Sequence, residues 1–301
     1  PWPAEIDHFS ASMLKMFDRC PEQARRRYIK GEKIAPGAAL IQGRADHAAI
    51  EHNFKRKLDT GEDVSVSDVQ FVFAEQLDAE IEENGGVTEI DFGKKVKGKT
   101  EKRKAAGAMK DSGVKLVTAY RVQECPSFYP TEVEEMFEVN VPGIPVPING
   151  RIDVVGYRQV AFAAPDEKQP LRIVDRKTTN RSFKVPERDW RVQAGIYMLH
   201  RWLPHEWHLS VKTKEPKIIT PDQHEMEGLV LKPSPLLKRQ TTMKLRHLAR
   251  AFATMYAAFG PDEPWDGAIL HQFACDYCGF RSSCPWWFTE YNLASRKAVV
   301  A

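Results

Sequence analysis

The sequence predicts an α/β protein whose strands form a core with helical segments before and after it. Helix-type periodicity dominates the first 125 residues of the 301-residue chain. Strand patterns around one further helix follow, and a long helix and a cysteine-rich segment close the chain. Because no repeat or low-complexity linker separates these parts, we expect a single domain over 1–301. Its parts are a mainly helical region at 1–125, a core at 126–232 and a C-terminal region at 233–301.

The N-terminal region contains several helix patterns. The segment "SASMLKMFDRCPEQARRRYI" follows a serine N-cap, Ser10 or Ser12, and Cys20-Pro21 interrupts it. Residues 41–58 predict a second helix, and 65–83 predict a third with a serine cap. A basic stretch, "GKKVKGKTEKRK", leads into a fourth helix. Such a stretch is either a solvated face or loop, or a surface that contacts phosphates. Its cations are Lys94, Lys95, Lys97, Lys99, Lys102, Arg103 and Lys104.

The core region begins with a hairpin pattern, "EEMFEVNVPGIPVPINGRIDVVGYR". The strand "LRIVDRKTTN" follows, and a helix pattern begins at Pro186. Further strands are predicted at "EWHLSVKT" and "PKIITP", before a long helix in 234–259. The "HEWH" of His205–His208 is one residue short of the H-E-x-x-H zinc motif, so we expect a strand there and no zinc protease.

Two strands carry acids that strands disfavour. Asp153 lies between Ile152 and Val154, and Asp175 ends an apolar strand two residues before Lys177. Residues two apart in a strand point to the same face. Two carboxylates and a lysine on one face predict a site for a divalent cation and catalysis. The alternative is a buried salt bridge between Asp175 and Lys177.

Together with three further motifs, these residues resemble the RecB-type branch of the PD-(D/E)xK nuclease superfamily. The motifs appear in the family's order as "GRADH", "GRID", "DRK" and "QAGIY", and "VEEMF" with Glu134 fits its first core strand. The resemblance implies a restriction-endonuclease-like core, a mixed central sheet flanked by helices. It implies metal ligation by His47, Asp153, Asp175 and the Arg176 carbonyl, with Mg²⁺ or Mn²⁺ as the metal. It also implies a catalytic lysine at Lys177, with Gln193 and Tyr197 lining the site.

Three of the five cysteines cluster in "CDYCGFRSSC", as Cys275, Cys278 and Cys284. In a chain with no secretion signal at its start, this spacing favours metal ligation over disulfides. Four thiolates suit zinc as well as iron, and His271 is an alternative to Cys20. The iron–sulfur subset of the branch, to which AddB and the CRISPR-associated adaptation nucleases belong, has the same arrangement with one N-terminal cysteine. That resemblance implies a [4Fe–4S] cluster on Cys20 and the three clustered cysteines. Cys125 is expected to be a small buried residue.

The composition is that of a soluble globular protein, with 42% hydrophobic and 28% charged residues and a net charge of +3. No apolar run is long enough for a spanning helix, and we expect an intracellular, cytoplasmic protein. There is no Walker A loop. Trp286 and Trp287 are either packing residues or base-stacking ones.

The resulting hypothesis is a metal-dependent DNA exonuclease that acts on single-stranded ends. Its pathway would be DNA repair, recombination, or phage or CRISPR DNA processing. The alternative is a non-catalytic or weakly catalytic DNA-binding subunit of a larger recombination or spacer-acquisition complex. No flavin or nicotinamide motif accompanies the cysteines, which argues against a redox enzyme.

Overall fold

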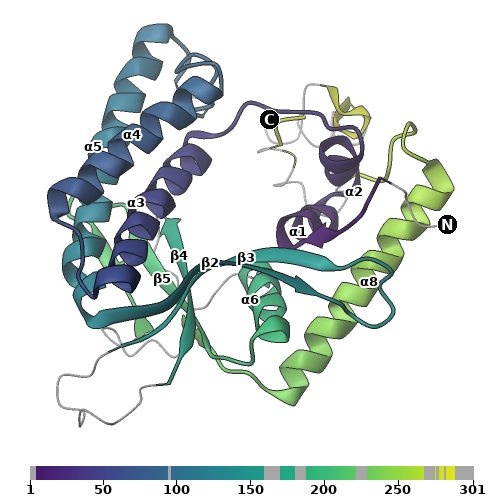
Figure 1. The fold of residues 1–301 in the computed structure, drawn as a ribbon. Coiled ribbons are helices and arrows are strands. Elements are labelled where there is room, and N and C mark those ends of the chain that lie inside the picture. Colours follow the sequence, from purple (N-terminus) through teal and green to yellow (C-terminus); the bar gives the residue numbers. More distant parts are fainter. Residues whose placement is uncertain are drawn as a thin grey trace, which may run out of the picture. The chain divides into compact units, whose positions relative to one another are not determined.

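The computed structural model describes residues 5–93, 96–158, 170–179, 188–221, 229–267, 275, 278–280 and 283–288 (Figure 1). The chain forms two compact units. Unit 1 consists of Pro1–Ile34, Glu138–Gly150 and Leu236–Ala301, and unit 2 consists of Ala35–Phe137 and Arg151–Pro235. The expectation of a single nuclease domain over 1–301 stays a prediction. Within the described ranges, no helix is long and apolar enough to cross a membrane.

Unit 1 combines an N-terminal segment with a C-terminal one. Its elements are β1 (Phe9–Ser10), α1 (Ala11–Arg19), α2 (Pro21–Ala24), a π-helical turn (Arg25–Ile29), most of α8 (Pro235–Phe259) and a 3₁₀ turn (Pro285–Phe288). The Ser10 hydroxyl accepts the Met13 N–H at 3.1 Å and caps α1. As predicted, Cys20 ends α1 and Pro21 begins the next helix.

Aromatic side chains form the core of unit 1. The Phe252 ring of α8 meets Phe9, Phe17 and Trp265 at centroid distances of 5.6, 5.2 and 5.0 Å. Such tilted and edge-on contacts add to the free energy gained by burying the rings. The long C-terminal helix is therefore held against the N-terminal segment.

Unit 2 contains a helical layer made of α3 (Ala38–Thr60), α4 (Val66–Glu83) and α5 (Lys99–Gln123). Ser65 and Asp68 form a capping box that begins α4. Gly113 of α5 lies under the Phe73 ring of α4, where an added Cβ would come within 1.9 Å of ring carbon Cζ. The glycine therefore permits the close approach of the two helices. Cys125 is fully buried in the same apolar core, as expected.

The strands of unit 2 form a mixed sheet. Its elements are β2 (Phe128–Val139), β3 (Ile148–Arg158, from Arg151 on), β4 (Arg172–Thr179), β5 (His205–Val211), β6 (Lys217–Ile219) and β7 (Val230–Leu231), with α6 (Arg188–His200) between β4 and β5. β2 pairs with β3, β3 is antiparallel to β4, and β4 is parallel to β5. The parallel β4–α6–β5 connection gives the α/β character predicted from the sequence.

Helices cover both faces of this sheet (Figure 1). Arg176 and His208 contact Tyr120 of α5 on one face. On the other face, Lys177 contacts Gln193 of α6, and the His205 ring packs on Tyr197 of the same helix. Because side chains alternate along a strand, Asp175 points to the α6 face. The mixed sheet flanked by helices is the predicted restriction-endonuclease-like fold.

Candidate functional site

The two strand acids lie at the same end of the β3–β4 pair. Val154 pairs with Val174 across the antiparallel ladder. Asp153 precedes the first of these residues and Asp175 follows the second, so the two acids are brought to one place. Asp175 is buried, with 1% of its surface exposed, whereas Asp153 is partly buried, with 24% of its side chain exposed. The sequence spacing alone did not show that the two strands meet in this register.

His47 of α3 completes this group of residues. Its Nδ1 is 3.3 Å from Asp153 Oδ2, and its Nε2 is 3.1 Å from the backbone oxygen of Arg176. The backbone N–H of Arg176 in turn donates to the Asp153 carboxylate. The backbone of Arg176 thus contacts both side chains, His47 through its carbonyl oxygen and Asp153 through its N–H.

The two carboxylates have opposite protonation tendencies. Burial, with repulsion from Asp175, raises the pKa of Asp153 to about 7. Burial acts in the same direction on Asp175, but Lys177 and the nearby His205 outweigh it, so the pKa of Asp175 lies well below its usual range. Two buried acids that cannot both be ionised at low cost are typical of a cation site or a proton-sharing pair.

His47 is neutral at physiological pH. Burial and the Arg176 charge lower the pKa of His47 to about 4, although the Asp175 charge opposes them. When Nε2–H donates to the Arg176 carbonyl, the lone pair of Nδ1 points toward Asp153. A neutral imidazole with one nitrogen fixed by a carbonyl is the form in which histidine binds metals.

A chain of hydrogen bonds runs from Asp175 through the lysine to α6. Lys177 Nζ donates to Asp175 Oδ1 at 2.7 Å and to Gln193 Oε1 at 3.5 Å. Gln193 Nε2 donates to the Tyr197 hydroxyl at 2.7 Å, which donates to the backbone oxygen of Arg151 at 2.9 Å. The structure thus brings together Asp153, Asp175, Lys177, Gln193 and Tyr197. Their catalytic roles stay predictions.

Asp153, Arg176 and Lys177 border a cavity of about 840 Å³. One wall is α3, which contributes residues from Ala39 to Lys55, among them His47 and Glu51. Glu134 of β2 also lines it, with φ of 56°, a conformation that non-glycine residues adopt at a cost and often at functional sites. Burial and repulsion from Glu51 and Asp153 raise the pKa of Glu134 to about 7. Among the described residues, four acids therefore line this cavity: Glu51, Glu80, Glu134 and Asp153.

The donor atoms fit a hard divalent cation. Asp153 Oδ2 and Asp175 Oδ2 are buried and have no hydrogen-bond partner, and carboxylate oxygens are what Mg²⁺ and Mn²⁺ prefer. The ligand set is not closed as the side chains stand. Among the residues that the structure describes, no three His, Cys, Asp or Glu side chains lie close enough together to hold a metal. The Asp175 carboxylate is instead engaged by Lys177 through Oδ1.

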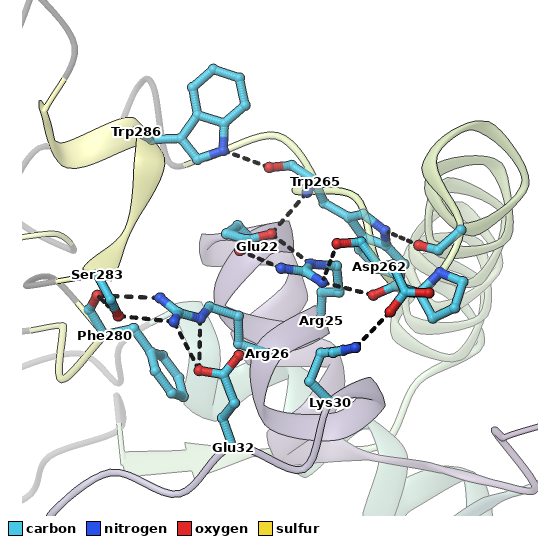
Figure 2. A network of polar contacts seen from close by, with 12 residues as sticks. Glu22, Arg25, Arg26, Lys30, Glu32, Asp262, Trp265, Phe280, Ser283 and Trp286 are labelled. Atoms are coloured by element: carbon cyan, nitrogen blue, oxygen red, sulfur yellow. Dashed lines mark hydrogen bonds and ion pairs between the residues drawn. The ribbon is translucent and has the colours of Figure 1, made fainter.

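The cysteine group lies in unit 1, where a polar network joins the N-terminal helices to the C-terminal segment (Figure 2). Arg26 donates to the Phe280 carbonyl and the Ser283 hydroxyl, and its guanidinium lies 4.8 Å from the Phe280 ring centroid. The buried pair of Glu22 and Arg25 binds Trp265 N–H and the Pro261 carbonyl. These contacts hold Phe280 and Ser283, which lie between Cys278 and Cys284 in the sequence, against Arg26.

The four predicted cysteines are close enough to influence one another. Burial, helped by the charges of Cys278, Cys275 and Cys284, raises the pKa of Cys20 to about 11, although a hydrogen bond from the Gln23 N–H opposes this shift. Burial also raises the pKa of Cys278, while the Phe280 N–H, Arg19 and Arg26 lower it. Backbone N–H groups and cations near clustered sulfurs stabilise thiolates. At Cys20 and Cys278 burial outweighs these groups, so both pKa values lie above the usual range. Among the described residues, no three cysteines lie close enough together to hold a metal.

Some of the predicted residues lie outside the described ranges, namely Lys94, Lys95, Pro186 and His271. Others are described but are not among the residues that line the cavity. Lys97, Lys99, Arg103 and Lys104 are exposed, and α5 begins at Lys99, so part of the basic stretch is helical. Lys102 Nζ instead donates to the Thr88 carbonyl. The Trp286 indole N–H donates to the Trp265 carbonyl at 2.6 Å, which supports a packing role.

Sequence reasoning missed several residues around the site. Glu51 lies one helical turn after His47, a spacing that would have placed it on the same face. Arg151 forms an ion pair with Glu134 at 2.5 Å. His205 was assigned only to a strand, yet its Nε2 lies 3.8 Å from Asp175 Oδ2. No local signal identifies it, because the contact depends on how β4 and β5 pair.

Among curated proteins, none matches the chain. Two solved structures are similar in fold. A protein described as "Putative exonuclease" from Eubacterium rectale aligns with a TM-score of 0.50 and 12% identity, covering 92% of this chain and 88% of the other. A protein named SSO0001 aligns with a TM-score of 0.37 and 14% identity, covering 95% of this chain and 90% of the other. At 12% identity and a TM-score of 0.50, the likeness to the Eubacterium rectale protein concerns the fold alone.

The decisive comparison is with protein families. The model of the PD-(D/E)XK nuclease superfamily matches residues 8–285, which span both units and include Asp153, Asp175 and Lys177. The mixed sheet agrees with that family's fold. The chain belongs to the PD-(D/E)XK nuclease superfamily.

Proposed function

We propose that this protein is a metal-dependent DNA nuclease that hydrolyses phosphodiester bonds with Mg²⁺ or Mn²⁺. One observation carries the proposal. Asp153 and Asp175 are gathered at the end of one strand pair, each with a buried oxygen that lacks a partner, and Lys177 is bonded to the second of them. Burying two carboxylates without compensation is costly, and a divalent cation supplies the compensation.

Each side chain then has a role that its surroundings allow. Asp153 and Asp175 would hold the cation, with His47 Nδ1 and the Arg176 carbonyl as further donors. A divalent cation bound there would lower the pKa of a water molecule and polarise a phosphoryl oxygen. Lys177 would orient the attacking water or stabilise the negative charge that develops on the phosphoryl group. Gln193 and Tyr197 fix that lysine through the hydrogen bonds described above.

We further propose that the substrate is a single-stranded DNA end. The cavity of about 840 Å³ lies in the size range of small-ligand sites, which suits a few nucleotides better than a duplex. The similarity in fold to a protein described as an exonuclease agrees with this choice. The host pathway would be repair, recombination, or phage or CRISPR DNA processing.

We also propose a [4Fe–4S] cluster on Cys20, Cys275, Cys278 and Cys284. Support comes from their mutual electrostatic influence and from the N–H groups of Gln23 and Phe280 directed at two of the sulfurs. Residue 20 and residue 284 are far apart in sequence, so a cluster would close a very long loop and limit the freedom of the unfolded chain.

A purely DNA-binding role explains the site less well. Phosphate contacts need only surface cations, whereas Asp153 raises the cost of folding by being buried beside a second acid. A binding subunit would have no use for that arrangement.

Digestion of single strands labelled at the 5′ or the 3′ end would test the proposed function. With Mg²⁺ or Mn²⁺ we expect mononucleotides or short products to be released progressively from one end, and none in EDTA. Cleavage of closed single-stranded circles at the same rate would contradict exonuclease action, and unchanged cleavage in EDTA would contradict metal dependence.

A further inference from the structure

β5 contains two fully buried histidines, its first and fourth residues, that face opposite sides of the sheet. His205 and His208 are both 0% exposed. They are three positions apart in the strand, so alternation places His205 on the α6 face and His208 on the α5 face. His205 lies on the same face of the sheet as Asp175, and His208 lies on the opposite face. The two buried histidines can therefore be compared.

His208 is a satisfied core residue. Its Nδ1 is 2.8 Å from the Tyr120 hydroxyl and its Nε2 is 3.3 Å from Arg158 Nη2. Glu206 Oε2 lies 3.6 Å from the same Nε2. Both ring nitrogens therefore have partners, as buried polar atoms usually do.

His205 differs in having no hydrogen bond at either ring nitrogen. The rings of Trp207 and Tyr197 pack against it at centroid distances of 4.6 and 5.7 Å. A buried imidazole with no partner destabilises the fold, so its presence between aromatic rings calls for an explanation. An apolar ring would fill that space without the cost.

The nearest acceptor to His205 is itself without a partner. Asp175 Oδ2 is buried, has no hydrogen bond, and lies 3.8 Å from His205 Nε2. The separation is about 1 Å longer than a hydrogen bond, which a small rotation of either side chain removes. The other oxygen, Oδ1, already accepts from Lys177.

We propose that His205 is a positioning residue for Asp175, with Nε2–H donating to Oδ2 when the carboxylate binds its cation. Lys177 and His205 would then hold the carboxylate plane from two sides and fix its rotation. Each carboxylate oxygen accepts more than one bond, so a donor at Oδ2 leaves room for a cation. Partners behind metal ligands typically change metal affinity by 10–100-fold.

This inference rests on the proposed metal site, and Mn²⁺ binding by calorimetry tests it without any need for cleavage. His205→Phe keeps the ring and removes both nitrogens, whereas His205→Gln restores an N–H donor near the Nε2 position. His208→Phe is the matched control, because it removes an equally buried histidine from the same strand. Asp175→Asn reports on the metal site itself.

We expect His205→Phe to weaken Mn²⁺ binding roughly tenfold or more and His205→Gln to recover most of that loss. His208→Phe should lower the melting temperature with little change in Mn²⁺ affinity. Equal affinity in His205→Phe and wild type, or equal losses in His205→Phe and His205→Gln, would overturn the proposal. If His205→Phe does not fold, His205→Asn, whose amide lies near Nδ1, takes its place. If Asp175→Asn keeps full affinity, the metal site fails rather than the role of His205 alone.

Discussion

Lys177 Nζ donates a hydrogen bond to Asp175 Oδ1 at 2.7 Å, and the two residues lie two positions apart in the same strand. The strand does not end at these residues, as the sequence suggested, but continues to Thr179. It can contain a buried acid and a lysine because their opposite charges compensate each other in part. The buried salt bridge that the sequence left open is therefore present, and it belongs to a larger set of contacts. Lys177 also reaches Gln193, and the second oxygen of Asp175 has no partner. The lysine thus links the candidate metal ligands to α6.

Replacing the lysine should separate chemistry from metal binding. Lys177→Ala removes the group that we expect to orient water or stabilise charge in the transition state. We expect cleavage to fall by roughly 100-fold or more while Mn²⁺ still binds. Single-turnover rates at saturating metal would measure the loss. A variant that cleaves near the wild-type rate would show that the lysine serves only as the partner of Asp175.

The α6 contacts should matter less than the lysine. Tyr197→Phe removes the hydroxyl between Gln193 and the Arg151 carbonyl, and Gln193→Ala removes the contact to Lys177. We expect each to lower the cleavage rate without changing Mn²⁺ affinity. Because both residues act through Lys177, a double variant that combines either substitution with Lys177→Ala should lose no more activity than Lys177→Ala alone. Full additivity would place these residues outside the lysine's network.

The cysteine group should carry iron. Anaerobically purified protein is expected to be brown, with about four irons per chain, as the proposed cluster requires. Cys20→Ala and Cys278→Ala should lose the colour and lower the melting temperature. Cys125→Ser is the matched control, since Cys125 is buried in the core of unit 2. Metal analysis that finds one zinc and no iron would contradict the cluster and leave a zinc site.

The exposed part of the basic stretch should contact phosphates if it lies on the DNA path. Lys97, Lys99, Arg103 and Lys104 are the exposed cations to change to Gln, because Lys102 is engaged by Thr88. Each lost contact should reduce the slope of log affinity against log salt by about 0.7 on single strands. Binding is best measured in an Asp175→Asn background, which prevents cleavage. An unchanged slope would assign these residues to a solvated helix end.

Two glycines of α5 should respond in opposite ways to alanine. An added Cβ at Gly113 meets the Phe73 ring at 1.9 Å, whereas at Gly107 nothing lies within 4 Å. Gly113→Ala should therefore destabilise the protein by about 1–3 kcal/mol through overpacking. Gly107→Ala should stabilise it by up to about 1 kcal/mol, since alanine favours a helix. Urea denaturation would measure both, and equal effects would contradict the packing of α4 on α5.

Much of this architecture is predictable from local sequence signals. Ser65 and Asp68 cap the start of α4, and Cys20-Pro21 marks the break between α1 and α2. Alternation along the strand places Asp175 and Lys177 on one face. Each of these features depends on residues close together in the sequence, so a local pattern is enough to predict it. The order of the four motifs predicts the family, which the match over residues 8–285 confirms.

The remainder depends on how distant segments meet. The place where Asp153 reaches Asp175 follows from the Val154–Val174 pairing, and His205 approaches Asp175 only because β5 lies parallel to β4. The positive φ of Glu134 has no sequence signal, because glutamate does not favour it. The short strands β1 and β7, two residues each, lack the length that a pattern needs.

Mn²⁺ binding to three single variants tests the central claim most directly. Asp153→Asn and Asp175→Asn remove a charge from the two candidate ligands. Asp63→Asn removes one from a mostly buried acid that pairs with Lys57 away from these ligands. Titration calorimetry should show binding by wild type and Asp63→Asn, and its loss in the other two together with cleavage. Wild-type affinity and cleavage in both Asp153→Asn and Asp175→Asn would contradict the assignment of this site.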